Sequence, residues 1–199
     1  MLTHMAQGLS SFFISRDIIK EEERKVYDYC FEILLATVIN LFAMVILAFA
    51  SGTIIPTICF IVGFIAIRAT AGGFHAETHI GCFIILISLY ILYLFLLLII
   101  PNFILSIITV IFCIISWLLV AIFSPVEDYN KPFSKGEYKK FKIVSNIAIF
   151  VVSCISLIFV FLFREVKYGF STATGMCVVS FSLIAGNIKN ELRRLGKNE

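Results

Sequence analysis

Charged residues are scarce in this sequence. Only 15% of its 199 residues are Asp, Glu, Lys or Arg, whereas 60% are hydrophobic, and the mean hydropathy is +1.02. A soluble domain of this composition would expose too much apolar surface to water. The scarcity of charge therefore excludes an ordinary soluble protein and indicates an integral membrane protein. The lipid bilayer is then one of its expected partners.

The sequence also lacks the signatures of several functional classes. It contains no glycine-rich nucleotide-binding loop, no nucleic-acid-binding motif and no internal repeat. The net charge of +3 is modest, and the basic residues lie in the segments beside the membrane, not in a pattern typical of a nucleic-acid-binding groove. The first residues lack an apolar core followed by a small-residue cleavage site, so we expect no removable signal peptide. We also expect no nucleic acid among the partners.

Six stretches contain no charged residue at all. About 20 residues are needed to cross the hydrocarbon core of a bilayer, and five of the six stretches reach or approach that length. The second is shorter: we expect it to extend through Ala71 with Arg68 reaching toward the lipid headgroups, or to form a re-entrant hairpin buried in protein. The six stretches are residues 33–50, 54–67, 82–100, 103–123, 143–163 and 170–188.

These stretches predict an all-α polytopic membrane protein with about six transmembrane or re-entrant helices, forming one membrane domain over residues 1–199. In residues 1–29 the apolar side chains of Leu2, Met5, Leu9 and Phe12 recur every three or four positions. This spacing predicts an amphipathic helix that lies on the inner leaflet.

The distribution of Lys and Arg predicts the orientation. If the first residue lies inside, 14 of the 16 basic residues fall in inner segments, and only Arg164 and Lys167 lie outside. Both termini, the loop 68–81 and the basic loop 124–142 then face the cytoplasm, an N-in/C-in arrangement. The basic loop would fix this orientation and rest on anionic lipid; a role in receiving an acidic peptide tail is a further alternative.

The reactive side chains of the chain are concentrated in residues 68–82. Two of the three histidines, the pair Gly72-Gly73, Arg68 and the thiol of Cys82 lie here between long apolar runs. Only in this segment do a nucleophile, a base and a permissive backbone coincide. The other five cysteines lie in or beside apolar stretches and are expected to be packed thiols: Cys30, Cys59, Cys113, Cys154 and Cys177.

A dyad of His75 and Cys82 requires a break in the chain. On one continuous helix the two residues would be separated by a rise of about 10.5 Å, too far for a thiol–imidazole hydrogen bond of about 3–3.5 Å. If Thr78 is a helix N-cap, His75 stays on the preceding loop and Cys82 enters the first turn of the next span. The unpaired N–H groups there favour a thiolate. His75 would then act as general base and general acid.

Two other interpretations of this segment remain open. Gly72 and Gly73 permit positive φ angles and close approach of another chain, but a glycine pair in a membrane protein can also serve tight helix packing. His75 and His79, four residues apart, could share a metal ion. The sequence has neither the His-Glu-x-x-His order nor a third ligand nearby, so we expect no metal and no cofactor.

The segment resembles a known family. Arg68, Gly72-Gly73, His75 and a cysteine seven residues later, at the inner end of a multi-span protein, are similar to the accessory gene regulator protein B (AgrB) family. Its members are membrane cysteine endopeptidases of Gram-positive quorum sensing. Residues 124–132, Ser-Pro-Val-Glu-Asp-Tyr-Asn-Lys-Pro, are similar to the family's Pro-Val-Glu...Asn-Lys-Pro segment.

The resemblance implies a specific reaction. Cys82 would attack an AgrD-like propeptide, release its acidic C-terminal tail and hold the rest as a thioester, which an internal cysteine or serine displaces to form a thiolactone or lactone. Arg68 and Gly73 match positions needed for activity, whereas Glu77 and His79 have no assigned role. The family further implies a homodimer in the cell membrane with its active site at the cytoplasmic face. The alternative class is a non-enzymatic peptide transporter or membrane scaffold.

Overall fold

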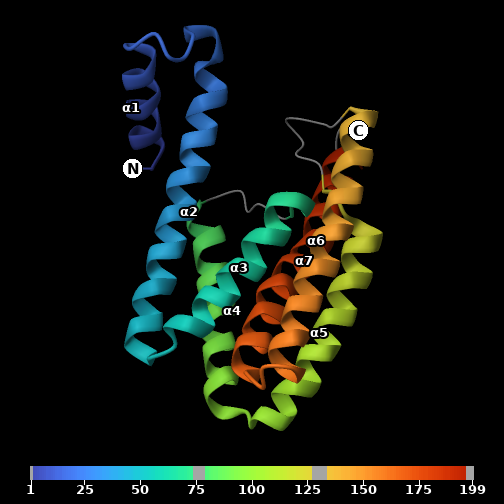
Figure 1. Cartoon of the computed structure of the whole chain (residues 1–199). Coiled ribbons are helices and arrows are strands. Elements are labelled where there is room, and N and C mark those ends of the chain that lie inside the picture. Colours follow the sequence, from blue (N-terminus) through green and yellow to red (C-terminus); the bar gives the residue numbers. More distant parts are fainter. Residues whose placement is uncertain (1, 74–78, 127–133, 196–199) are drawn as a thin grey trace.

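The computed structural model describes residues 2–73, 79–126 and 134–195 (Figure 1). In this part of the chain every regular element is helical. The elements are α1 (Leu2–Ile14), the 3₁₀ turn η1 (Glu21–Glu23), α2 (Arg24–Ser51), α3 (Ile54–Ala71), α4 (His79–Ile99), α5 (Asn102–Phe123), α6 (Lys135–Phe161) and α7 (Val166–Leu195).

Six of the described helices, α2 to α7, are long and apolar enough to cross a membrane. The predicted all-α polytopic fold is therefore confirmed. The structure also decides between the two forms expected for the short second stretch, because α3 continues without interruption for 18 residues to Ala71. At 1.5 Å per residue its length is about 27 Å, close to the thickness of the hydrocarbon core. The structure thus has the extended helix, not the re-entrant hairpin.

Helix α7 lies at the centre of the bundle (Figure 1) and packs against α3, α5 and α6. Nearly three quarters (72%) of its apolar window is buried, compared with 11–28% for the other spans. It is also the least hydrophobic span, because it is rich in serine, threonine and glycine. Such residues are unfavourable against lipid tails but allow helices to approach closely within protein, which explains the central place of α7.

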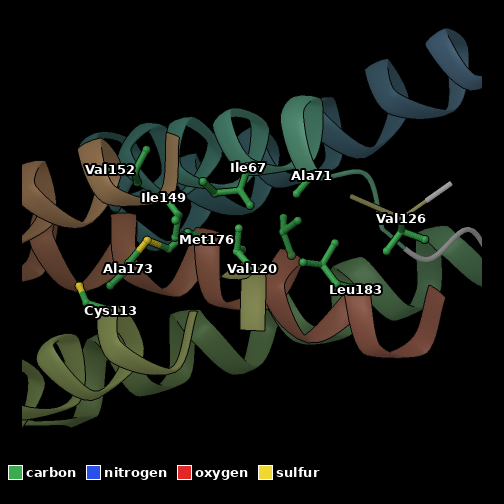
Figure 2. Close-up of a cluster of buried hydrophobic side chains, with 11 residues drawn as sticks. Ile67, Ala71, Cys113, Val120, Val126, Ile149, Val152, Ala173, Met176 and Leu183 are labelled. Atoms are coloured by element: carbon green, nitrogen blue, oxygen red, sulfur yellow. The ribbon is translucent and has the colours of Figure 1, made fainter. Parts of the chain in front are cut away.

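Helices α3 and α7 approach each other at two glycines. A Cβ atom added to Gly63 would collide with the backbone carbonyl of Thr172, and one added to Gly175 would collide with that of Phe60. From this contact toward the end of α3, apolar side chains of α3, α5, α6 and α7, together with Val126, form one core cluster (Figure 2). The cluster includes Ile67 and Ala71 at the end of α3, so the core extends up to the predicted reactive segment.

The N-terminal helix is paired with α2. The rings of Phe13 and Phe31 stack with centroids 5.5 Å apart, and the Thr3 hydroxyl donates to the Glu32 carboxylate at 2.7 Å. Figure 1 shows α1 beside the half of α2 that projects beyond the other helices. The predicted helix is therefore present, but part of its surface is covered by α2; its contact with the inner leaflet stays a prediction.

The helices place the segments around residues 72 and 125 at one end of the bundle. Because successive spans alternate in direction, the end of α3, the start of α4, the end of α5 and the start of α6 lie together there (Figure 1). The end of α7 reaches the same region. In the described part of the chain, the opposite end carries the three connections 52–53, 100–101 and 162–165.

Candidate functional site

Helix α3 ends in a turn that only glycine accommodates easily. Gly72 has a φ of 76° and Gly73 a φ of 139°, and both angles lie in the region that residues with a Cβ rarely adopt. A Cβ on Gly72 would lie 2.8 Å from the Val126 carbonyl oxygen. A Cβ on Gly73 would collide with the side chains of Arg68 and Ser182. The glycine pair thus serves a tight turn and the close approach of a loop and side chains.

The Arg68 side chain is directed into the bundle. Its Nη1 donates to the Ser182 hydroxyl of α7 at 3.4 Å, and Ser182 in turn donates to the carbonyl of Val179 at 2.7 Å. The expectation that Arg68 reaches toward the lipid headgroups is therefore wrong. The physical reason is that a hydrogen-bond acceptor on α7 is available within reach, and that Gly73 leaves space for the guanidinium beside it.

Cys82 lies in the first turn of α4, as predicted. The connection from α3, which ends at Ala71, to the described start of α4 at His79 includes residue 75, so the break between residues 75 and 82 stays a prediction. The thiol is partly exposed, and it interacts electrostatically with the guanidinium of Arg68. Two of the residues singled out from the sequence, Arg68 at the end of α3 and Cys82 at the start of α4, therefore lie near each other.

The other predicted members of the site lie outside the described residues. His75, Glu77 and Thr78 fall in the segment 74–78, and His79 is described only as the first backbone position of α4. The predicted His75–Cys82 hydrogen bond therefore stays a prediction. Among the described side chains no three of His, Cys, Asp or Glu gather as metal ligands would.

Four of the remaining cysteines agree with their predicted role as packed thiols, whereas for Cys30 the prediction is wrong, because its side chain is exposed. All six cysteines of the chain are free. Cys113 and Cys177 are buried, Cys59 and Cys154 are half-buried, and Cys30 is exposed on the projecting part of α2. Only Cys82 combines partial exposure with an arginine neighbour.

The segment Ser124–Val126 supports the glycine turn from the opposite side. Val126 donates its backbone N–H to the carbonyl of Ala71 at 3.0 Å, so it satisfies one of the unpaired carbonyl groups at the end of α3. Ser124, Pro125 and Val126 are all buried. The Val126 side chain belongs to the same core cluster as Ala71 and Leu183 (Figure 2).

Sequence reasoning missed Ser182 and this supporting role of residues 124–126. Ser182 is one of many small polar residues in α7, and only the folded structure selects it as the partner of Arg68. The sequence did indicate that the loop 124–132 matters, because its Pro-Val-Glu segment is similar to the corresponding segment of the family. That similarity gave no contact partner.

The comparisons with known proteins give one match. The family model of accessory gene regulator B matches residues 6–183. This range includes the whole candidate site, the spans α2 to α6 and the first half of α7. Neither the curated proteins nor the solved structures contain a match to the chain. The chain belongs to the accessory gene regulator B family, multi-pass membrane proteins that take part in the processing of a quorum-sensing peptide.

Proposed function

We propose that the protein is a membrane cysteine endopeptidase that removes the C-terminal tail of an AgrD-like propeptide and promotes closure of its thiolactone or lactone ring. The observation that supports this proposal is the electrostatic interaction of Cys82, near the start of α4, with Arg68, which lies beside the glycine turn at the end of α3. A thiol at a helix N-terminus beside a guanidinium has the two features that stabilise a thiolate. The thiolate is the nucleophilic form of cysteine.

In the first step the Cys82 sulfur attacks the carbonyl carbon of the scissile peptide bond. The C–N bond breaks, the acyl group stays on sulfur as a thioester, and the tail leaves as an amine that needs one proton. We assign the proton transfers to His75, as base toward the thiol and as acid toward the leaving amine. Arg68 lies close enough to Cys82 for an electrostatic interaction between the guanidinium and the sulfur.

In the second step an internal cysteine or serine of the bound peptide attacks the thioester. The attacking group gives its proton to His75, its new thioester or ester bond closes the ring, and the bond between the acyl carbon and the Cys82 sulfur breaks to release a thiolate. Thioester exchange preserves the activation of the acyl group, which direct hydrolysis would lose. A cysteine nucleophile therefore suits ring closure better than an alcohol or a metal-bound water would. The proposal includes a cytoplasmic site and a homodimer as the working form.

The test compares cysteine variants in membranes that also contain the cognate propeptide. Cys82→Ala should abolish release of the tail, whereas Cys154→Ala, at a half-buried position far along the chain, should leave it intact. The reaction is followed by mass spectrometry of both peptide products. Full processing by Cys82→Ala would refute the peptidase and leave the transporter or scaffold as the function.

A trapped intermediate tests the order of the steps. A propeptide whose internal nucleophile is replaced by alanine should accumulate on the wild-type protein as a hydroxylamine-sensitive adduct, because the second step has lost its attacking group. The adduct should map to Cys82 and should not form with His75→Ala. An adduct on another cysteine would remove Cys82 from the role of nucleophile, and a normal yield with His75→Ala would remove His75 from the role of base.

A further inference from the structure

The ammonium group of Lys142 forms hydrogen bonds within the protein. Lys142 lies in the second turn of α6, and its Nζ donates to the carbonyl oxygens of Ala121 at 2.5 Å and Ser124 at 2.6 Å. Ala121 belongs to the last turn of α5, where carbonyl groups have no partner within the helix. A cation at this end of a helix also complements the helix dipole. Lys142 therefore caps α5.

Two further contacts fix the chain where it leaves α5. The amide of Asn187, on α7, donates to the carbonyl of Phe123 at 3.1 Å. The hydroxyls of Ser124 and Ser145 lie 2.5 Å apart. Residues from α6 and α7 thus hold the start of the segment Ser124–Val126, and Lys142 supplies the charged contact among them.

Through this segment Lys142 is connected to the glycine turn. Val126 donates to the carbonyl of Ala71, and its own carbonyl oxygen occupies the space that a side chain on Gly72 would need. Gly73 follows directly and lies against the guanidinium of Arg68. A chain of contacts thus connects Lys142, through the Ser124–Val126 segment and the glycine turn, to Arg68.

We propose that Lys142 is a positioning residue of the peptidase site, a role that rests on the proposed function. Without its ammonium group two partly buried carbonyl oxygens lose their donor, and the Ser124–Val126 segment shifts to regain partners. A displacement of about 1 Å at a reacting group can lower a rate about 100-fold. Lys142 does not touch the reacting atoms, so it acts through the backbone of the loop and the glycine turn.

This role separates Lys142 from the other lysines of the basic loop. Lys139 and Lys140, on the same helix, are exposed to solvent. They remain available for anionic lipid or for an acidic peptide, whereas Lys142 is not. Lys140→Met is therefore a matched control, because it removes the same charge from the same helix without removing the cap of α5.

The kinetic test uses the full-length protein in lipid vesicles and a synthetic AgrD-like propeptide. Lys142→Met should lower kcat for tail release about 10- to 100-fold with little change in KM. Lys142→Arg, which can still donate to two carbonyls, should recover most of this loss, and Lys140→Met should keep the wild-type kcat. A wild-type kcat for Lys142→Met, a change confined to KM, or an equal loss in Lys142→Arg would overturn the proposal.

Amide hydrogen exchange supplies a readout that needs no reaction. The Val126 amide should exchange about tenfold faster in Lys142→Met than in the wild type or Lys140→Met, because the hydrogen bond to Ala71 opens more often. Amides of the contact between α3 and α7 should keep their protection. Faster exchange throughout the bundle would make Lys142 a general stability residue and overturn the positioning role, as would an unchanged Val126 amide.

The outcomes separate this inference from the proposed function. If Cys82→Ala still releases the tail, the peptidase fails whatever Lys142 does. If Cys82→Ala is inactive while Lys142→Met has a normal kcat and normal exchange at Val126, only the positioning role fails.

Discussion

At the scale of single residues, Gly73 shows how one missing side chain allows the site to form. Its hydrogen atom takes the place where a methyl group would meet both the guanidinium of Arg68 and the hydroxyl of Ser182. Its φ of 139° adds a second reason for glycine, because this angle is unfavourable for any residue with a Cβ. Both the limited space and the backbone angle therefore require glycine at position 73.

We therefore predict that Gly73→Ala lowers the rate of tail release about 100-fold, because the methyl group displaces Arg68 from Cys82. Gly52→Ala is the matched control: Gly52 also has a positive φ, 68°, but a Cβ there would meet no atom within 4 Å. It should retain near-wild-type cleavage. Release of the tail in membranes measures both variants, and a Gly73→Ala variant as active as Gly52→Ala would contradict the steric argument.

At the scale of elements, the sequence predicted the spans well and their ends less well. Absence of charge located all six apolar helices, because charged groups are costly within the hydrocarbon. It missed the first turns of α6, which begins at Lys135 instead of residue 143. The capping box of Ser134 and Glu137 starts this helix in the polar region, where charge is no obstacle.

The site was predictable in composition but not in contacts. The clustering of Arg68, the glycines and Cys82 in one segment singled out one end of the bundle, and the predicted place of Cys82 near the start of the next span agrees with α4. The partners Ser182 and Lys142 lie more than 50 residues further along the chain. Their selection depends on how α6 and α7 pack, which no local pattern encodes.

The contact between α3 and α7 gives a prediction about stability. Gly175→Ala should destabilise the protein by about 1–3 kcal/mol, because the added methyl group would strike the carbonyl of Phe60. Gly136→Ala, in the first turns of α6, meets no atom within 4 Å and should be neutral or slightly stabilising, by about 0.5–1 kcal/mol. Unfolding in detergent mixtures measures both; a neutral Gly175→Ala would show that the two helices can separate without cost.

At the scale of the whole molecule, the candidate site lies at the end of the bundle that carries most of the basic residues. The glycine turn, the end of α5 and the start of α6 lie at the same end, and Arg164, before α7, and Lys167, in its first turn, lie at the other. The excess of Lys and Arg at the first end predicts that it faces the cytoplasm. The propeptide would then meet the site before any export.

Single cysteines in a background without the six native ones test this orientation. A membrane-impermeant thiol reagent should label Lys167→Cys, an exposed position at the start of α7, from outside intact cells. It should label Lys135→Cys only after the inner face is opened. Labelling of Lys135→Cys from outside would reverse the orientation and place the site on the outer face.

The central position of α7 bears on how the protein is made. This helix follows the other five spans in the chain, yet it supplies the surface on which α3, α5 and α6 pack. A ribosome delivers the spans in order, so the earlier helices enter the bilayer before their common partner exists. Its low hydropathy of 1.4 also makes α7 the weakest candidate for insertion by itself. The contacts of α7 with these helices, including the hydrogen bond from Arg68 to Ser182, can therefore form only after α7 has been synthesised.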